Sequence, residues 1–333
     1  MIIQAHAAFA AREKLQPYSF ETKALQPFEV DIKITHCGIC HSDIHLIDDD
    51  WKISRYPLVP GHEVVGTVVS LGPAAEHLKI GQRVGVGWQS GSCMSCEWCV
   101  RGEENLCVHD QATCVGRPGG FADRIITDSR FAFPIPDSLE SENAAPLLCG
   151  GITVYSPLRY YQVRPEMKVG VIGIGGLGHL AVQYTRAYGC EVTAFSSSPE
   201  KEAEARKFGA HHFVVHTDTK RVSSLKRQFD FILSTVYVQM DWNQFVGLLK
   251  PHGSLVFVGA GGVLNIPAGT LLSFKSVGGS AIGSRNMISE MLEFSARHAI
   301  KAVTEPVPMS QVNQAVDRVR QGKARYRMVL VNS

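Results

Sequence analysis

The sequence lacks both a long apolar run and a strong excess of one charge. No apolar segment reaches the ~18 to 20 residues that a transmembrane helix requires. The formal net charge is +2 over 333 residues, and there is no polybasic run. These features exclude a membrane-spanning helix and give no electrostatic reason to expect binding to nucleic acid or to an anionic membrane. We therefore expect a protein that acts on small molecules.

Targeting signals and repeats are missing as well. Residues 1–14 have no basic n-region, and His6, Arg12 and Glu13 interrupt their Ala-rich part, so we expect no secretory signal. The odd number of cysteines, nine, includes C-x-x-C pairs beside histidines, which in an unsecreted chain favours metal binding over disulfides. We expect a cytoplasmic protein that is long enough, and at 45% hydrophobic residues apolar enough, for two domains.

What the sequence does contain is a dense group of metal-binding residue types between positions 37 and 63. A thiolate and an imidazole together suit zinc, and a catalytic zinc keeps three protein ligands and one open position. Cys40, just past a predicted strand at 30–36, and His62 are two candidate ligands. Cys149 is the best remaining candidate for the third. Asp43 would accept the free ring N–H of His62 and fix its tautomer.

A second group of cysteines forms a compact pattern of its own. Four thiolates at this spacing can surround one tetrahedral ion and leave no open position, which predicts a structural zinc. An iron–sulfur cluster or a disulfide pair are the alternatives. The remaining thiols, Cys37, Cys114 and Cys190, are expected to be buried as small hydrophobes. The four candidate ligands are Cys93, Cys96, Cys99 and Cys107.

The second half of the chain opens with a glycine-rich turn in the context that a dinucleotide site requires. A predicted strand at 168–172 precedes it, and a helical stripe that ends at Gly189 follows it. Backbone N–H groups at such a helix N-terminus favour a pyrophosphate. Further strands with intervening helices predict a six-stranded doubly wound parallel sheet. The turn itself is Gly173, Ile174, Gly175, Gly176, Leu177 and Gly178.

The end of the next predicted strand lacks an acidic residue. NAD-specific domains usually place Asp or Glu there, about 20 residues beyond the glycines, to bind the ribose hydroxyls. This chain has Ser196 and Ser197 instead, followed by Lys201. Serine hydroxyls can donate to a 2′-phosphate and a lysine supplies positive charge, so we predict NADPH over NADH. The serines could also cap the helix that follows.

Five motifs in this order resemble those of the zinc-dependent medium-chain alcohol dehydrogenases, most closely the cinnamyl-alcohol-dehydrogenase and broad-specificity aldehyde-reductase branch. The resemblance implies a GroES-like β-rich catalytic domain, residues 1–151 and 284–333, around a Rossmann domain at 152–283. It also implies a homodimer and a substrate site in the cleft between the domains. The motifs are CGICHSD, GHE, the four-cysteine loop, PLLCGGITVY and GIGGLG.

The resemblance also implies roles for individual residues. Ser42 and His45 would relay the hydroxyl proton between the buried site and the surface. Glu63 would be a carboxylate that helps ligand exchange at the metal. Read without the family, Asp43 could simply cap a turn, and Glu63 could pair with a surface cation. The residues expected to contact the cofactor are His41, Thr153, Val258, Gly259, Ala260 and Arg327.

Together these residues predict an NADP(H)-dependent zinc enzyme that interconverts aldehydes and primary alcohols and acts mainly as an aldehyde reductase. By the same resemblance, Trp51 and Trp88 would line the substrate cleft, although each could be ordinary core. The rivals are a polyol or amino-alcohol dehydrogenase, which often has a carboxylate where this chain has Cys149, and a non-catalytic zinc and nucleotide-binding redox sensor. His211, His212 and His216 are expected to be solvated and to lack cysteine or acidic partners.

Overall fold

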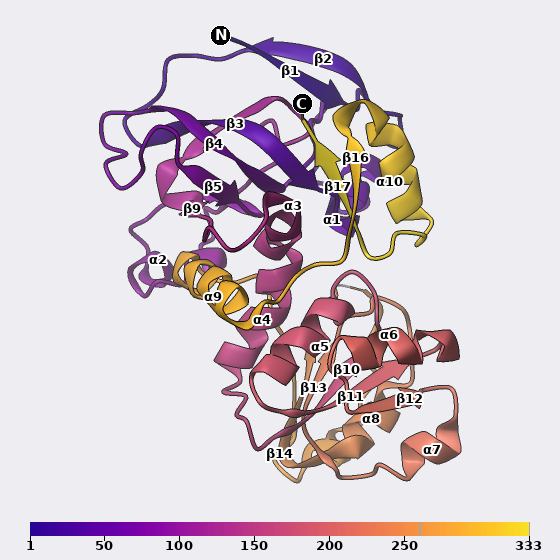
Figure 1. Ribbon diagram of the computed structural model, residues 1–333. Helices are drawn as coiled ribbons and strands as arrows, with labels where there is room; N and C mark the ends of the chain where they lie inside the picture. The colour runs from indigo at the N-terminus through magenta and orange to yellow at the C-terminus, as the bar shows by residue number, and fades with distance from the viewer. Residues whose placement is uncertain (260, 333) are drawn as a thin grey trace. The chain divides into compact units, whose positions relative to one another are not determined.

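The computed structural model describes residues 1–259 and 261–332. Contacts divide the chain into two compact units. Unit 1 is formed by Met1–Ile152 and Gly283–Ser333, and unit 2 by Thr153–Ile282. Unit 1 therefore takes both ends of the sequence, as the early and late colours of its ribbon show (Figure 1).

A mixed sheet forms the body of unit 1. Its central strand β3 alternates buried and more exposed residues along part of its length, and it pairs with β4, β8 and β17 in antiparallel register. The strands run in the order β16, β17, β3, β4, β5, β9, with β8 beside β3, while β1 pairs with β2 and β6 with β7 outside this sheet. The strands of unit 1 are β1 (Ile2–Ala7), β2 (Gln16–Glu21), β3 (Glu29–Gly38), β4 (Glu63–Leu71), β5 (Arg83–Val86), β6 (Gln89–Gly91), β7 (Gln111–Ala112), β8 (Arg124–Asp128), β9 (Ala132–Pro134), β16 (Thr304–Pro308) and β17 (Arg327–Val331).

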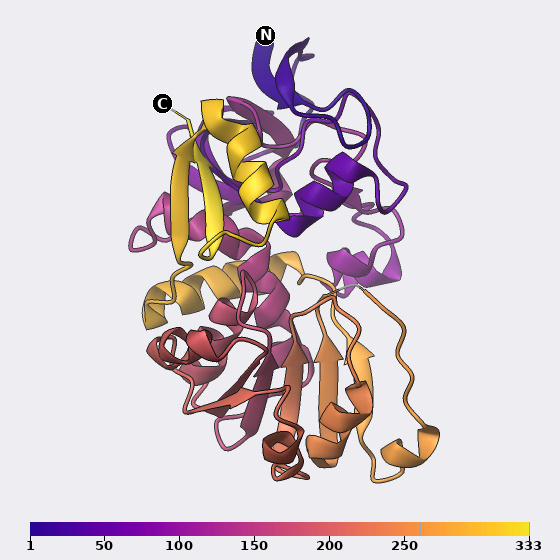
Figure 2. The same cartoon turned by 90° about the vertical axis from the view of Figure 1, so that its right-hand side faces the viewer.

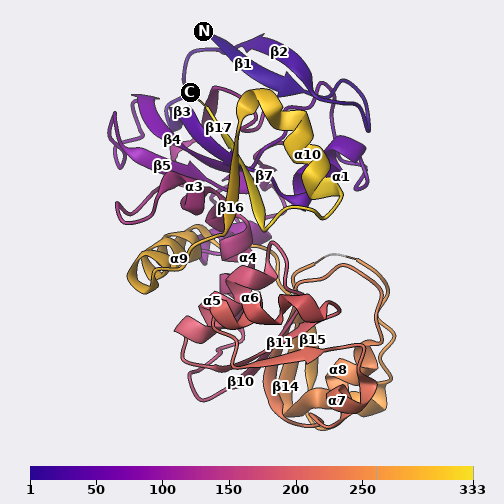
Figure 3. The same ribbon diagram turned by 45° about the vertical axis from the view of Figure 1, so that its right-hand side comes forward.

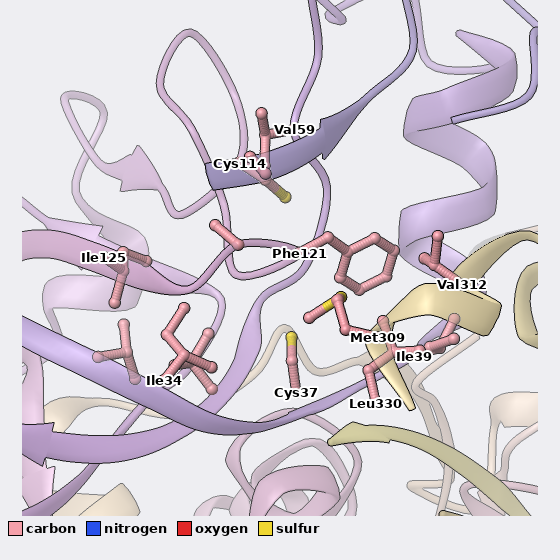
Figure 4. Packing of buried hydrophobic residues seen from close by; sticks show 14 of the residues in the cluster. Ile34, Cys37, Ile39, Val59, Cys114, Phe121, Ile125, Met309, Val312 and Leu330 are labelled. Carbon is pink, nitrogen blue, oxygen red and sulfur yellow. The ribbon is translucent and has the colours of Figure 1, made fainter. Parts of the chain in front are cut away.

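The core of unit 1 contains two of the cysteines that have no metal-binding pattern. Cys37 and Cys114 are fully buried in a cluster with Ile34, Phe121 and Leu330. Figure 4 shows the ring of Phe121 within this group, with Cys37 and Cys114 among the neighbouring side chains. Both thiols thus behave as the small hydrophobes that the sequence predicted.

Helix α10 (Val312–Arg320) covers part of the unit 1 sheet and contacts β16 and β17 (Figure 3). Its buried residues are Val312, Ala315, Val316 and Val319, the stripe that the helical period predicts. The other helical segments in this unit are α1 (His41–Asp48), α2 (Glu97–Val100), η1 (Glu104–Leu106), η2 (Ser129–Phe131), α3 (Ser141–Ala144), η3 (Ala145–Leu148), α9 (Arg285–His298) and η6 (Met309–Gln311), and α4 (Gly150–Tyr160) continues into unit 2.

In unit 2 the described strands form one parallel sheet in the order β12, β11, β10, β13, β14, β15, which confirms the predicted doubly wound arrangement (Figure 2). The chain order reverses between β10 and β13, so the carboxyl ends of these strands border the site where such sheets bind ligands. The strands are β10 (Lys168–Ile172), β11 (Glu191–Ser196), β12 (His212–Val215), β13 (Phe229–Ser234), β14 (Leu249–Phe257) and β15 (Ser276–Gly279).

Helix α5 (Gly178–Ala187) starts directly after the glycine turn and contacts β10 and β11. The remaining helical segments of unit 2 are η4 (Pro199–Lys201), α6 (Glu202–Lys207), α7 (Thr219–Ser223), α8 (Trp242–Leu248) and η5 (Ala268–Leu271). Across the described residues of both units, no helix combines the length and the apolar character that crossing a bilayer requires.

Candidate functional site

Asp43 ties together the two loops that carry the first predicted metal ligands. It is fully buried at the start of α1, and its Oδ2 accepts the backbone N–H of Cys40 at 2.8 Å. Its Oδ1 accepts the backbone N–H of Gly61 and lies 2.9 Å from Nδ1 of His62. A carboxylate can only accept from this nitrogen, so Nδ1 carries the proton and Nε2 keeps its lone pair for a metal.

Three side chains from separate parts of unit 1 meet beside this carboxylate. The Sγ of Cys149 lies 3.3 Å from Nε2 of His62 and 3.9 Å from Sγ of Cys40. Zinc–ligand bonds of about 2.0 to 2.3 Å at tetrahedral angles place ligand atoms about 3.5 to 3.8 Å apart, so the set fits one such ion. Together with a carboxylate oxygen of Glu63, the three ligand atoms lie within 4.8 Å of one another.

Cys40, His62 and Cys149 shift one another's pKa values. A hydrogen bond from the Cys149 thiol lowers the pKa of Cys40 well below its usual value, and the same bond raises the pKa of Cys149. Burial alone would lower the pKa of His62, but the Asp43 carboxylate and the Cys149 sulfur outweigh burial and raise it. A thiolate and an imidazole that keeps its Nδ1 proton are ligands that bind a divalent zinc ion.

Glu63 and Arg327 form a buried ion pair next to the three ligands. The guanidinium of Arg327 donates to Oε1 of Glu63, and both side chains are almost inaccessible to solvent. Burial raises the pKa of Glu63 to about 7 even though Arg327 opposes the shift. Oε2 of Glu63 and Nε of Arg327 have no hydrogen-bond partner within the described residues. Glu63 therefore pairs with a buried cation and not with the surface cation considered as an alternative. Arg327, which the sequence predicted to contact the cofactor phosphates, contacts Glu63 in this structure.

The predicted proton-relay residues lie on α1, directly after Cys40. The Oγ of Ser42 is 3.7 Å from Sγ of Cys40, which places this hydroxyl next to the metal ligands. His45, three residues later, lies toward solvent with Nδ1 2.8 Å from Oδ2 of Asp50. His41 is partly buried, which lowers its pKa, and its ring centroid is 6.4 Å from that of His45.

Aromatic rings link these two ends of the site. Trp88 meets His62 edge to face with ring centroids 5.0 Å apart, and Trp51 lies 6.0 Å from Trp88. Trp51 in turn lies 5.1 Å from His45. Trp88 also lines a cavity of about 1010 Å³ in unit 1. The two tryptophans therefore adjoin the site, although their contact with a substrate stays a prediction.

The four-cysteine loop closes on itself within unit 1. The Sγ of Cys93 lies 3.5 Å from Sγ of Cys107 and 3.9 Å from Sγ of Cys99. All four sulfur atoms, including that of Cys96, are within 4.8 Å of one another. These separations exceed the S–S bond of about 2.05 Å in a disulfide and match ligands around one tetrahedral ion. The loop fits a metal and not a disulfide pair.

Local donors and an ion pair support this loop. The backbone N–H groups of Ser95 and Cys96 and the thiol of Cys107 lower the pKa of Cys93 to about 5. Glu104, between the third and fourth cysteines, is buried and pairs with Arg285 at the start of α9, with 3.1 Å between Oε1 and the guanidinium. The lowered pKa of Cys93 favours the thiolate that a metal cation binds. The ion pair connects the loop to α9.

Replacing Cys107 by serine is expected to lower the metal content by about one ion per chain and to lower the melting temperature by about 5 to 10 °C. The reason is that three remaining thiolates bind the ion weakly, and the loop loses the ion that holds it together. Elemental analysis and thermal unfolding measure both quantities. The matched control is Cys190→Ala, which removes a buried thiol from unit 2 and should leave the metal content unchanged. Unchanged metal content in Cys107→Ser would contradict a four-thiolate site.

In unit 2 the glycine turn follows β10 with almost no space for side chains. A Cβ at Gly178 would lie 1.8 Å from the carbonyl oxygen of Gly173, so only glycine permits this approach. Gly173 has φ of +88° and a Cβ there would lie 2.4 Å from Val236. A Cβ at Gly175 meets nothing within 4 Å, so this residue faces open space where a ligand can approach.

The predicted phosphate-binding residues lie around the same edge of the sheet. Ser196 ends β11 and is buried, and its Oγ accepts the backbone N–H of Ser198, so the hydroxyl shapes the turn and keeps its own proton to donate. Ser197 is exposed. The Nζ of Lys201 donates to the carbonyl of Ile174 in the glycine turn at 2.6 Å.

The other predicted cofactor contacts are less closely grouped. Val258 and Gly259 follow β14, and the N–H of Val258 donates to the carbonyl of Ser234. Thr153 is buried in α4. Ala260 lies outside the described residues. Val258 and Gly259 thus lie at the carboxyl end of the parallel sheet, beyond the strand that pairs with β13.

Two contacts of the predicted site residues could not be found from the sequence pattern, and one sequence expectation was wrong. Asp50 lies in a run of three aspartates without any signal that marks it as the partner of His45. The Cys114 thiol lies within 4.8 Å of His62 and Asp43, although its position in the sequence indicates only a buried residue. His212 does have an acidic partner, because its Nε2 lies 3.0 Å from Oε1 of Glu191.

Comparisons with known proteins define the class to which this fold and site belong. Residues 26–137 match the family model of the alcohol dehydrogenase GroES-like domain, and residues 176–297 match that of the zinc-binding dehydrogenases. The mixed sheet of unit 1 and the parallel sheet of unit 2 are thus the GroES-like and Rossmann folds that the motifs predicted. The protein is an oxidoreductase of the zinc-binding dehydrogenase class.

Its relatives are more specific. An aldehyde reductase of Synechocystis sp. is 45% identical over 100% of this chain and 99% of its own length. A cinnamyl alcohol dehydrogenase structure from Sorghum bicolor is 39% identical with a TM-score of 0.95, covering 99% of this chain and 98% of that one. A CAD structure from Helicobacter pylori, complexed with NADP(H), is 34% identical with a TM-score of 0.91, covering 99% and 98%. Mannitol dehydrogenases also occur among the relatives. This chain belongs to the zinc-dependent medium-chain alcohol dehydrogenase family, in the branch that contains the aldehyde reductases and cinnamyl alcohol dehydrogenases.

Proposed function

We propose that this protein reduces aldehydes to primary alcohols with NADPH at a zinc site formed by Cys40, His62 and Cys149. The observation that carries the proposal is the convergence of these three side chains, from three separate segments, within 4.8 Å of one another. A zinc ion held there would act as a Lewis acid on the carbonyl oxygen, and bound NADPH would supply the hydride. Aldehyde reductases and cinnamyl alcohol dehydrogenases among the relatives support this chemistry.

The chain's own residues would hold and move the proton that the reduction consumes. Ser42, whose hydroxyl lies 3.7 Å from the Cys40 sulfur, would donate a proton to the substrate oxygen. His45 would take up a proton from solvent and pass it toward Ser42. Asp50 lies 2.8 Å from Nδ1 of His45 and orients this ring for proton exchange.

We assign the two chemical tasks to the two units. Unit 1 would be the catalytic domain, with a second, structural zinc in the loop of Cys93, Cys96, Cys99 and Cys107, and unit 2 the dinucleotide-binding domain. The choice of NADPH rests on Ser196 in place of an acidic residue and on the charge of Lys201. The NADP(H) complex of the Helicobacter pylori relative supports it. The homodimer and the cytoplasmic location stay predictions.

Zinc-replete protein is expected to oxidise NADPH when benzaldehyde or hexanal is added, and to do so faster than it oxidises NADH. The absorbance of the reduced nicotinamide measures both rates. An apolar aldehyde is the expected substrate if Trp51 and Trp88 border it. Protein from which zinc has been removed by a chelator should lose the activity, and added zinc should restore it.

The same assay separates the rival functions. A polyol dehydrogenase would oxidise mannitol with NADP⁺ or NAD⁺ faster than it reduces either aldehyde, and the mannitol dehydrogenases among the relatives favour testing this substrate. Cys149, where such enzymes often have a carboxylate, argues for the aldehyde. Consumption of neither cofactor with any aldehyde or alcohol, in protein that binds NADPH and zinc, would support the redox sensor.

A further inference from the structure

The glycine turn of unit 2 is held by side chains that come from outside it. Its successive carbonyl oxygens, from Ile172 to Gly175, each lie within hydrogen-bond distance of a side-chain donor. The Oγ1 of Thr235, after β13, is 2.9 Å from the oxygen of Ile172 and 3.1 Å from that of Gly173. Because the Ile172 oxygen already accepts the backbone N–H of Thr235, the single hydroxyl proton can be donated to the Gly173 oxygen. The Lys201 ammonium donates to the oxygen of Ile174, and the fourth carbonyl has His179 as its partner.

His179 lies in the first turn of α5 and is fully buried. Its Nδ1 is 3.0 Å from the carbonyl oxygen of Gly175, which also accepts the backbone N–H of His179 at 3.1 Å. Because a carbonyl only accepts, Nδ1 must carry the proton and donate it. The ring packs against Phe208 with centroids 5.5 Å apart, which fixes its orientation. A buried imidazole thus donates its Nδ1–H to a carbonyl of the turn.

Holding the carbonyls determines where the neighbouring N–H groups point. In a trans peptide the C=O of one residue and the N–H of the next lie in one rigid plane and point in opposite directions. With the oxygens of Gly173, Ile174 and Gly175 engaged, the N–H groups of residues 174–176 are directed to the other side. None of these three N–H groups donates a hydrogen bond within the described residues. Unpaired N–H groups of this kind are the donors that a pyrophosphate recruits.

We propose that His179 and Thr235 are positioning residues of the cofactor site, which fix the direction of these N–H groups and so set the affinity for the pyrophosphate of NADPH. Neither residue touches the reacting atoms, so their contribution is to binding and not to hydride transfer. The inference rests on the proposed function, because it requires that NADPH binds at this turn.

Two pairs of variants test the proposal. His179→Leu removes the ring donor, whereas His179→Asn keeps an N–H close to the position of Nδ1. Thr235→Val removes the hydroxyl, whereas Thr235→Ser keeps it. Thr185→Val is the control, because Thr185 is fully buried in α5 and donates to the carbonyl of Ala181 within the helix, away from the turn. The measurements are the Kd of NADPH, the Kd of adenosine 2′-monophosphate, which has no pyrophosphate, and kcat and KM separately.

The expected result is a rise of about tenfold in the Kd and KM of NADPH for His179→Leu and Thr235→Val, since about tenfold corresponds to one orienting hydrogen bond. The Asn and Ser variants should stay within about twofold of the parent protein, as should Thr185→Val. The Kd of adenosine 2′-monophosphate and the kcat at saturating NADPH should not change in any of them.

Three other outcomes would overturn the inference. NADPH affinity equal to the parent in both apolar variants would exclude a positioning role. An equal loss of affinity for adenosine 2′-monophosphate would indicate general damage to unit 2. A parent protein that does not bind NADPH would refute the proposed function itself before any variant is compared. If His179→Leu does not fold, the pair at Thr235 decides between these outcomes.

Discussion

Cys149→Ala is expected to lower kcat/KM for aldehyde reduction by about a thousandfold or more. The thiol is buried, and its sulfur lies 3.3 Å from Nε2 of His62 and 3.9 Å from Sγ of Cys40. With two of three ligands left, the ion would be lost or held without its geometry, and the carbonyl would no longer be polarised. Metal content should fall from about two ions per chain to about one.

Two variants make this result specific. Cys190→Ala also removes a buried thiol, but in unit 2, where Cys190 contacts the carbonyl of Arg164. It should keep both metal ions and most of the activity. Cys107→Ser should lower the melting temperature and keep most of the activity. Cys149→Ala should lose the activity with a smaller change in melting temperature. Activity within about tenfold of the parent in Cys149→Ala would show that Cys149 is not a ligand that the chemistry needs.

The sequence could predict the ligands because the donor types are rare and their local context is strong. Cys40 follows a strand, and His62 lies beside an acidic residue in a short region dense in metal-binding types. That Cys149, 87 residues beyond His62, reaches them could be anticipated only from elimination and resemblance. In the structure the three side chains lie together. The sequence of unit 2 also predicted its strand, glycine turn and helix correctly, which are β10, residues 173–178 and α5.

Contacts that depend on exact backbone geometry could not be read in this way. Asp48, Asp49 and Asp50 are identical residue types in a row, and only the left-handed conformation of Asp49, with φ of 54°, turns the chain so that Asp50 reaches His45. Glu63 and Arg327 are 264 residues apart, and no local pattern links them. Their pairing follows from β17 and β4 both bordering β3.

The glycine turn shows the same limit at a finer scale. Its glycines predict unpaired N–H groups and close approach, because both follow from the missing Cβ. The donors that hold its carbonyls are a histidine, a lysine and a threonine, from α5, η4 and the segment after β13. Each of these residue types is common at such places, so only the distances reveal that they act on one turn.

Ser196→Asp is expected to lower kcat/KM with NADPH by about a hundredfold to a thousandfold and to keep or raise kcat/KM with NADH. A carboxylate at the end of β11 would repel the 2′-phosphate, and juxtaposed like charges cost several kcal/mol, which corresponds to this range. The same carboxylate can accept hydrogen bonds from the two ribose hydroxyls of NADH. Initial rates with each cofactor at saturating aldehyde measure the ratio.

The control for this charge is Ser223→Asp, which adds an equal charge to unit 2 at an exposed position on α7. Its preference for NADPH should equal that of the parent, because an exposed charge away from the site is screened by water and salt. Because Ser196 also accepts the N–H of Ser198 through its Oγ, an aspartate oxygen can keep this bond, so the turn should survive the substitution. An unchanged ratio of NADPH to NADH activity in Ser196→Asp would mean that the 2′-phosphate does not lie at the end of β11, and the preference would then have to come from elsewhere in unit 2.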